Sequence, residues 1–223
     1  MFYILLDKQH FFNIVVLRYY FQGERGAFMT KQKTDPRVIR TRQLLLDSFT
    51  SLIQKKDFSD ITVRDITEKA TVNRATFYAH FTDKFEMLDT IMSETFMTTL
   101  RKRVNSEEEL SYQTIENIFL SMCEFHKNLS KNCPCGYHSL STVIEKKIKD
   151  DLQKVIYALF LNESTNKIYL KDDKLLQVIS TMMSWSIYGA AYTWNNGEYE
   201  ITAEELASKT MPLIMSGIET LHN

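Results

Sequence analysis

The chain has 223 residues, of which 44% are hydrophobic and 25% charged, and its formal net charge is −1. That length suits one large domain, or a small domain fused to a medium one. Only 6 glycines and 3 prolines occur, which disfavours tight-turned strands and favours long helices. Three cysteines, with no secretory signal before them, indicate a reduced cytoplasmic compartment.

Charge is unevenly distributed along the chain. Residues 31–84 hold 11 Lys and Arg against 7 Asp and Glu, whereas residues 85–223 hold 13 against 19. A basic segment joined to an acidic body is typical of a protein that touches nucleic acid at one end. An excess of this size is common by chance, so nucleic-acid binding has to be judged from the motifs.

Residues 1–28 differ from the rest in being rich in aromatic and β-branched residues without a helical period. Polar residues between Asp7 and Arg18 break the apolar run, so neither a membrane anchor nor a signal peptide fits. We expect natural translation to begin at Met29, because the ERG shortly before it can be encoded by a purine-rich run resembling a ribosome-binding site. The alternative is a genuine N-terminal strand or arm.

From Pro36 the apolar periodicity is helical. One face of a first helix, ending near 55–57, carries Ile39, Leu45, Phe49, Leu52 and Ile53. The segment ITVRDITEKA then predicts a short second helix with Thr62 as its N-cap and Asp65 at the third helical position. Ile61 can pack on Ile66 across this cap.

The third helix follows at once. Only Thr71 and Val72 separate the second helix from Asn73, which is a second N-cap, and so brief a turn forces a steep crossing, as in a helix-turn-helix. We expect Thr82 to cap a fourth helix. Phe77 and Phe81 point into the core, which leaves outward-facing donors on the third helix and one at the start of the next: Arg74, Thr76, Tyr78, His80 and Lys84. This density of donors indicates DNA contact.

The stretch ITVRDITEKATVNRATFYAHFTDKFEML resembles the DNA-binding head of the tetracycline-repressor (TetR) family of bacterial transcription regulators. The core T-F-Y-x-H-F-x-x-K runs from Thr76 to Lys84, and the resemblance covers about Arg37–Ile91. One departure is Thr71, which stands where the family usually has Gly. A threonine is tolerated there if the backbone avoids positive φ.

The resemblance implies two groups of DNA-binding residues. Those expected to hold phosphates are Thr62, Asn73, Tyr78, His80 and Lys84, the last also because free backbone N–H groups at a helix start favour phosphate. Those expected nearest the base edges are Arg74, Ala75 and Thr76, with the Arg74 guanidinium suited to bidentate contact with guanine.

The remaining chain predicts helices over about 111–128, 143–160, 174–194 and 203–220. The helix over 174–194 is apolar almost all round, which predicts burial on every side. Thr202 and Glu205 give the last helix a capping box, and Pro212 can kink it. By the resemblance this body binds an effector and forms a homodimer through its last two helices. Candidate residues for an apolar effector pocket are Phe119, Met122, Phe125, Tyr157, Met182, Trp185 and Tyr188, although each alone fits plain core.

One further cluster has the residue types of a zinc or thiol sensor: Cys123, His126, Cys133, Cys135 and His138. Its C-x-C spacing is tighter than structural zinc sites use, so incidental cysteines are the favoured interpretation and no metal is expected. No phosphate-binding loop, nucleophile elbow or zinc-protease motif occurs, so neither an enzyme nor a cofactor is expected.

The expected protein is all-α. It has a leader or arm over 1–30, a three-helix helix-turn-helix head over 31–84, and a helical effector-binding and dimerisation bundle over 85–223. The function implied is a cytoplasmic homodimeric regulator that binds a double-stranded palindromic operator, represses, and is released by a small-molecule effector, with no membrane partner. The alternative is a protein-binding coactivator that has lost DNA binding.

Overall fold

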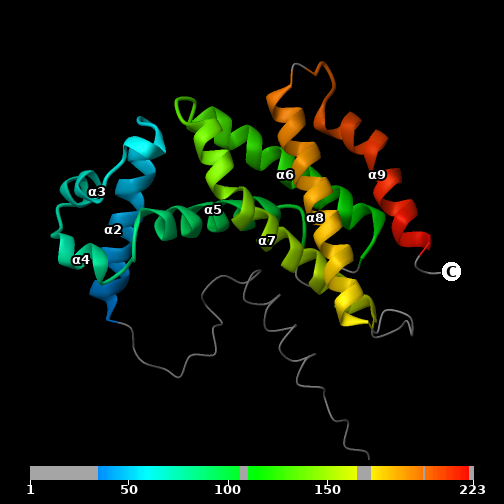
Figure 1. Cartoon of the computed structure of the whole chain (residues 1–223), viewed down its shortest axis with the longest axis horizontal. Coiled ribbons are helices and arrows are strands. Elements are labelled where there is room, and N and C mark those ends of the chain that lie inside the picture. Colours follow the sequence, from blue (N-terminus) through cyan, green and yellow to red (C-terminus); the bar gives the residue numbers. More distant parts are fainter. Residues whose placement is uncertain (1–34, 106–109, 165–171, 198, 221–223) are drawn as a thin grey trace, which may run out of the picture. The chain divides into compact units, whose positions relative to one another are not determined.

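The computed structural model describes residues 35–105, 110–164, 172–197 and 199–220, with the side chains of 162–164 and 217–220 left aside. The expected leader or arm lies outside these ranges. Every regular element in the described residues is helical, so the all-α class is confirmed (Figure 1). The elements are α2 (Pro36–Ile53), the 3-10 helix η2 (Phe58–Asp60), α3 (Val63–Ala70), α4 (Arg74–Tyr78), α5 (Lys84–Leu100), α6 (Tyr112–Asn132), α7 (Tyr137–Ser164), α8 (Asp173–Asn196) and α9 (Ala203–Thr220).

The chain divides into two compact units. Of the described residues, the head unit contains 35–95 and 127–148, and the body unit contains 96–105, 110–126, 149–164, 172–197 and 199–220. The head unit is therefore larger than the basic segment over 31–84, because it also takes in the first part of α5 and the connection between α6 and α7.

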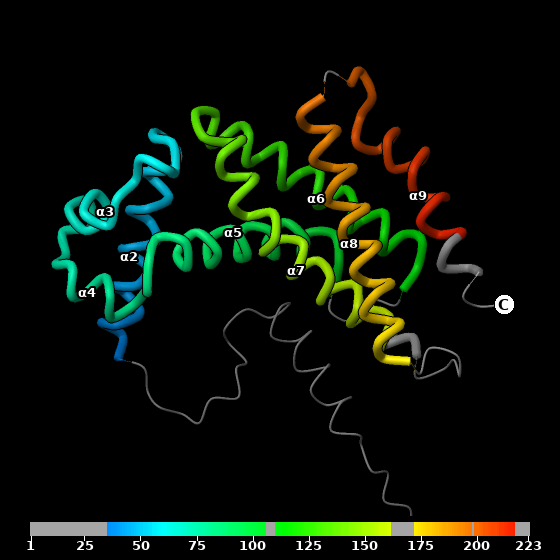
Figure 2. The backbone as a smooth tube through the Cα atoms, viewed as in Figure 1, coloured from blue at the N-terminus to red at the C-terminus, as the bar shows by residue number. Residues whose placement is uncertain are grey.

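Helix α2 supplies the central face of the head core. Leu45, Phe49 and Ile53 are buried there, as their spacing predicts. The expectation that Ile39 shares this buried face is wrong, because its side chain is 58% exposed. Ile39 lies in the first turns of α2, where residues 35–40 are all exposed. Figure 2 shows α3 and α4 beside α2 at the blue and cyan end of the chain.

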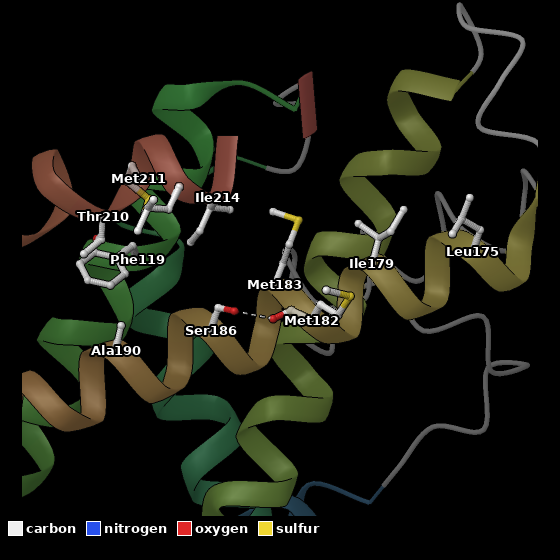
Figure 3. A pocket seen from close by; sticks show the side chains of 11 residues that line it. Phe119, Leu175, Ile179, Met182, Met183, Ser186, Ala190, Thr210, Met211 and Ile214 are labelled. Atoms are coloured by element: carbon white, nitrogen blue, oxygen red, sulfur yellow. Dashed lines mark hydrogen bonds between the residues drawn. The ribbon is translucent and has the colours of Figure 1, made fainter. Parts of the chain in front are cut away.

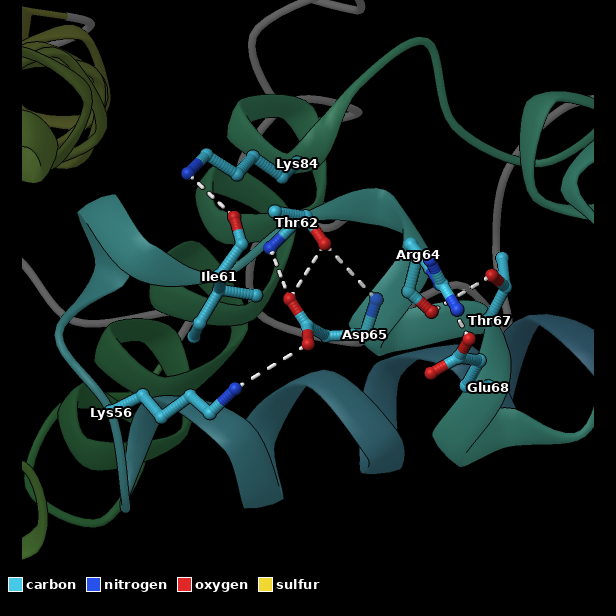
Figure 4. A network of polar contacts seen from close by, with 8 residues as sticks. All are labelled: Lys56, Ile61, Thr62, Arg64, Asp65, Thr67, Glu68 and Lys84. Carbon is cyan, nitrogen blue, oxygen red and sulfur yellow. Dashed lines mark hydrogen bonds and ion pairs between the residues drawn. The ribbon is translucent and has the colours of Figure 1, made fainter.

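The predicted capping box opens α3. The Thr62 Oγ1 accepts from the Asp65 N–H at 3.2 Å, and the Asp65 carboxylate accepts from the Thr62 N–H at 2.8 Å. Both Ile61 and Ile66 are fully buried, as the predicted packing across the cap requires. The Lys56 ammonium, 3.4 Å from the Asp65 carboxylate, adds an ion pair between the end of α2 and α3 (Figure 4).

The turn between α3 and α4 is a Schellman motif. The Val72 N–H donates to the Thr67 carbonyl at 3.0 Å and the Thr71 N–H donates to the Glu68 carbonyl at 3.2 Å. Such a motif needs a left-handed residue, and Thr71 has φ 56° and ψ 41°. The condition under which a threonine is tolerated without strain at this position, a backbone that avoids positive φ, is therefore not met: the hydrogen bonds of the turn impose the conformation that glycine adopts without strain.

Helix α4 is short, with five residues, and Asn73 caps it as predicted. The Asn73 Oδ1 accepts from the Thr76 N–H at 2.7 Å. Phe77 and Phe81 are both buried, with ring centroids 6.1 Å apart. The Arg42 guanidinium of α2 lies 4.2 Å from the Phe81 ring centroid and donates to the carbonyl that follows α4, that of His80. Burial and capping together hold a helix that is too short to be stable alone.

The N-cap of α5 is Asp83, one residue later than the predicted Thr82. The Asp83 Oδ1 accepts from the N–H groups of Phe85 and Glu86, at 2.8 and 2.9 Å. The Glu86 carboxylate reaches back to the N–H and hydroxyl of Thr82, both at 2.7 Å. Thr82 thus contributes a donor, whereas the aspartate next to it supplies the capping oxygen.

The body helices occur where the sequence predicts them, and α9 begins with the expected capping box between Thr202 and Glu205. Within the single chain only one face of α8 is buried, so burial on every side stays a prediction that depends on the second copy. One face of α8 packs into the body core through Leu176, Met183 and Ile187, and the opposite face is exposed. Apolar periodicity on all sides does not distinguish a helix surrounded by its own chain from one with an uncovered apolar face. No helix in the described part of the chain is long and apolar enough to span a membrane.

Replacing Thr71 by Gly should raise the free energy of unfolding of the head. Removing the Cβ relieves a left-handed cost of roughly 1–2 kcal/mol, and the greater freedom of glycine in the unfolded chain returns about half of that. A net gain of about 0.5–1 kcal/mol is expected from urea unfolding. Thr71→Ala keeps the Cβ and is the control, with a much smaller change. A Thr71→Gly variant no more stable than Thr71→Ala would contradict the strain.

Candidate nucleic-acid interface

The outer face of α4 presents the side chains that the sequence singled out. Arg74, Ala75 and Tyr78 are exposed, the Tyr78 ring by 54%, while Thr76 and His80 are half-buried. The two phenylalanines of the same stretch, Phe77 and Phe81, are buried on the opposite side. A short helix held from behind by two aromatic anchors therefore presents donors outward, as base and phosphate contact requires.

Two candidate residues use part of their polar groups as caps. The Asn73 Oδ1 is engaged by the Thr76 N–H and by the Thr76 hydroxyl, the latter at 3.0 Å. That leaves the Asn73 amide NH₂ to donate outward. The Thr62 hydroxyl donates to the Asp65 carboxylate at 2.6 Å, so a phosphate at Thr62 would compete with that carboxylate for one proton.

Lys84 is placed differently from the other candidates. Its Nζ donates to three backbone carbonyl oxygens, those of Phe58 at 2.9 Å, Ser59 at 3.2 Å and Ile61 at 2.7 Å. Figure 4 shows the side chain turned toward Ile61 and the start of α3. The backbone N–H groups behind it are engaged as well, since Asp83 caps the start of α5.

The start of α5 carries negative charge rather than an open anion site. Hydrogen bonds from the backbone and hydroxyl of Thr82 lower the pKa of the Glu86 carboxyl, which stays anionic beside the capping Asp83. Both features that made this helix start attractive for phosphate, namely unengaged N–H groups and an available ammonium, are therefore used within the head unit.

The cysteine and histidine cluster forms no metal site in the described residues, where no group of three or more candidate ligands comes together. Burial raises the pKa of the Cys123 thiol to about 12 and that of Cys133 to about 11, with the Glu204 charge adding to the effect at Cys123. Both thiols are therefore protonated and poor nucleophiles at neutral pH. Burial lowers the pKa of His126 to about 4, so its ring, which packs against Tyr188 and Tyr192, is neutral.

The body unit contains an apolar groove between α8 and α9, with a volume of about 610 Å³ (Figure 3). Its lining consists of Phe119, Leu175, Ile179, Met182, Met183, Ser186, Ala190, Thr210, Met211, Leu213 and Ile214. The two hydroxyls among these donate to carbonyls of their own helices, Ser186 to Met182 and Thr210 to Leu206, each at 2.9 Å. The groove lining carries no charged side chain and therefore suits an apolar occupant.

The seven effector-pocket candidates do not all meet at this groove. Phe119 and Met182 line it. Met122, Phe125 and Tyr188 are buried core residues. The Tyr157 hydroxyl donates to Asp173, and the exposed Trp185 ring has the Lys149 ammonium 4.8 Å from its centroid. The α9 side chains of the groove, Met211, Leu213 and Ile214, are not among the candidates, because nothing local in the sequence shows which helix lies opposite.

The groove continues into an exposed apolar stripe along α8. Leu175, Val178, Met182 and Trp185 recur at helical spacing and are between 45% and 65% exposed. Leu213 of α9 is 79% exposed beside them. We call these five side chains the apolar stripe. A contiguous apolar face of this kind marks an interaction surface.

The head unit thus contains a helix-turn-helix whose second helix, α4, carries exposed donors. Residues 45–91 match the family described as "Bacterial regulatory proteins, tetR family". Over 71 residues the chain is 41% identical to the "Uncharacterized HTH-type transcriptional regulator YxbF" of Bacillus subtilis (strain 168). This match covers 31% of the chain and 18% of that relative, so the chain spans about a fifth of the relative's length.

Two solved structures share the fold. A TetR transcriptional regulator from Streptococcus agalactiae 2603V has a TM-score of 0.50 and 21% identity, over 81% of this chain and 96% of that one. The dihydroxyacetone kinase operon activator DhaS also has a TM-score of 0.50, with 17% identity over 82% of this chain and 98% of that one. The likeness to these two structures extends over most of the chain and concerns the fold, whereas the match to the TetR family covers residues 45–91.

The capping box at α3 should make the head sensitive to acid. Hydrogen bonds from the hydroxyl and N–H of Thr62 lower the pKa of Asp65 to about 2, below its value near 4 in an unfolded chain. A lowered pKa contributes stability above the unfolded value, and that contribution is lost as the pH falls from about 4 toward 2. Asp65→Asn should therefore melt lower than wild type at pH 7, with the difference shrinking by pH 2. Asp47→Asn, at an exposed carboxyl of α2, is the control, and parallel melting curves of Asp65→Asn and wild type at every pH would contradict this.

Proposed function

We propose that the protein is a homodimeric, sequence-specific regulator that binds a palindromic DNA operator through α4 of each protomer. The observation that carries this proposal is the arrangement of α4, where buried Phe77 and Phe81 hold a helix whose exposed face offers Arg74 and Tyr78. Each protomer contributes one short reading helix, so useful specificity needs two half-sites bound at once.

The candidate DNA-binding side chains fall into two groups, those placed near base edges and those whose donors suit phosphate. Arg74 is exposed at the first position of α4, the end that contacts base edges in helix-turn-helix proteins, and its planar guanidinium matches two acceptors of guanine. Ala75 and Thr76 follow it along the same end. The Asn73 amide, the Tyr78 hydroxyl and the His80 ring are donors suited to phosphate, as is Thr62 where it releases Asp65.

Arg74→Ala should cost about 1–3 kcal/mol on the duplex that the wild-type protein selects from a random-sequence pool. It should also relax base preference at one position in each half-site, because a guanine loses its bidentate partner. Arg64→Ala is the matched control: Arg64 is an exposed arginine of α3 that pairs with Glu68. Affinities measured on all single-base variants of the duplex test this. An equal loss on every variant would make Arg74 a phosphate contact.

The second copy of the chain is the proposed occupant of the apolar stripe and its groove. The stripe and the groove form one continuous apolar face on α8 and α9, and the groove lining carries no charged side chain that would oppose burial. Two such faces placed against each other around a twofold axis would cover both stripes. Two protomers related in this way would read the two halves of a palindrome.

Met182→Glu should produce monomers. Met182 is exposed in the free protomer, so the carboxylate costs little there, but in the dimer it would be buried without a partner, at a cost of several kcal/mol. The head keeps its own core, so weak, salt-sensitive DNA affinity should remain while discrimination between sequences is lost. Val143→Glu, at an exposed apolar residue of the head unit, is the control. Sedimentation with gel-shift titration tests both effects, and a dimeric Met182→Glu variant would place the interface elsewhere.

Repression and release by an effector are the remaining parts of the proposal. A dimer bound over a promoter would exclude polymerase, although DhaS is described as an activator, so the fold also serves activation. The groove suits an uncharged apolar molecule, which would compete with the second copy for the same face. To test this competition, such compounds are titrated into the protein–DNA complex, and the amount of dimer and the amount of DNA complex are measured together. Release of DNA by an intact dimer would place the effector elsewhere.

The alternative function is a protein-binding coactivator that no longer reads DNA. Such a protein has no need for donors on α4, yet Arg74 and Tyr78 remain exposed there. Failure of the wild-type protein to shift any duplex, at low salt and high protein concentration, would favour this alternative.

A further inference from the structure

The connection between α2 and α3 is tied to two other elements of the head unit. We call residues 57–61 the junction, since they lead from α2 through η2 to the Thr62 cap of α3. Three of its carbonyl oxygens, those of Phe58, Ser59 and Ile61, accept from the Lys84 Nζ at the start of α5. Lys84 and the residues that it contacts are 23 to 26 positions apart in the sequence.

The other side of the junction is tied to the start of α7. The Asp57 carboxylate accepts from the N–H of Ser59 at 2.9 Å and from the Ser139 hydroxyl at 2.8 Å. The backbone also approaches closely, because a Cβ added to Gly136 would lie 3.4 Å from the Asp57 Cα. These hydrogen bonds lower the pKa of Asp57, which keeps it an anionic acceptor. The junction is therefore held from both sides.

The Lys84 ammonium has no proton left for a DNA phosphate in this arrangement. An ammonium has three protons, and three carbonyl oxygens lie within 3.2 Å of it. Its charge also lies 4.5 Å from the Phe58 ring centroid and 5.8 Å from that of Phe85. Turning toward a phosphate would break charge-assisted hydrogen bonds and leave the carbonyl oxygens of Phe58 and Ile61, both part-buried, without this donor.

We infer that Lys84 supports DNA binding from inside the head, as a positioning residue that holds the junction, and not as a phosphate contact. The junction delivers the chain to the Thr62 cap, and α3 in turn packs on both α2 and α4. Lys84 thereby sets the angle at which α4 is presented. This inference rests on the proposed function only for its effect on DNA, because the hold on the junction is a property of the free protein.

Hydrogen exchange on the free protein tests the hold directly. In the junction, the N–H of Asp60 donates to the Asp57 carbonyl at 3.1 Å and that of Ile61 donates to the Phe58 carbonyl at 3.2 Å. In Lys84→Met these two amides should exchange roughly tenfold faster than in wild type, because the turn loses its cross-link. Lys55→Met, which removes the same charge from an exposed lysine of the head, is the control with unchanged exchange. Unchanged exchange in Lys84→Met would overturn the inference.

Loss of folding in Lys84→Met would also bear on the inference. An unfolded head in Lys84→Met, with Lys55→Met folded, would support the internal role, because removing a phosphate ligand leaves the free protein intact. Lys84→Arg then serves for the DNA measurements. It keeps the charge, but its planar donors do not converge on three carbonyls, so a phosphate contact would survive this change and the hold on the junction would not.

Salt titrations on two duplexes separate the possible roles of Lys84. The probes are a 40-base-pair duplex of mixed sequence and the duplex that the wild-type protein selects from a random pool. We expect Lys84→Met, corrected by Lys55→Met, to keep the wild-type salt slope and to lose about tenfold in preference for the selected duplex. A slope smaller by about 0.9 per head would identify a phosphate contact and overturn the inference.

If Lys84→Met keeps both the wild-type salt slope and the wild-type preference for the selected duplex, then Lys84 contributes only to stability. That result would also overturn its role in DNA binding. Failure of the wild-type protein to bind either duplex would remove the proposed function, yet the exchange result would still decide whether Lys84 holds the junction. The two failures are therefore distinguishable.

Discussion

Helix α4 depends on the burial of two phenylalanines. With five residues it is far shorter than any helix that is stable alone in water. Phe77 and Phe81 anchor it to the head core, and Arg42 covers the Phe81 ring while bonding the carbonyl of His80. The outward direction of the α4 donors therefore follows from the core behind them.

The basic residues of the head serve two different purposes. Arg42 turns inward to a carbonyl and an aromatic ring, and Lys84 turns inward to the junction. Lys56 stays exposed and pairs with the carboxylate of Asp65. Arg74 faces outward. A positive balance in the sequence thus overstates the charge available to phosphates. Under the inference drawn for Lys84, the angle at which Arg74 is presented depends on a cation that does not itself contact DNA.

The body unit leaves an apolar face uncovered while its core is well filled. Helix α8 buries Leu176, Met183 and Ile187 on one side and exposes Val178 and Met182 on the other. A helix that is apolar all round joins the core of one chain and offers a second surface for assembly. Under the proposed function, assembly and DNA selection are coupled, because a single head reads too little DNA to discriminate.

The sequence by itself determined the helices, the caps at Thr62, Asn73 and Thr202, and the donors on α4. These features depend on residues three or four apart, so periodicity and cap spacing report them. Only the tertiary structure decided the partners of Lys84, the lining of the groove between α8 and α9, and which face of α8 is covered. Those contacts join residues that are distant along the chain, and their identity depends on which helices pack together. The left-handed Thr71 is local in origin, because the hydrogen bonds that fix its φ join residues three and five apart, but a threonine in the sequence does not by itself announce a positive φ.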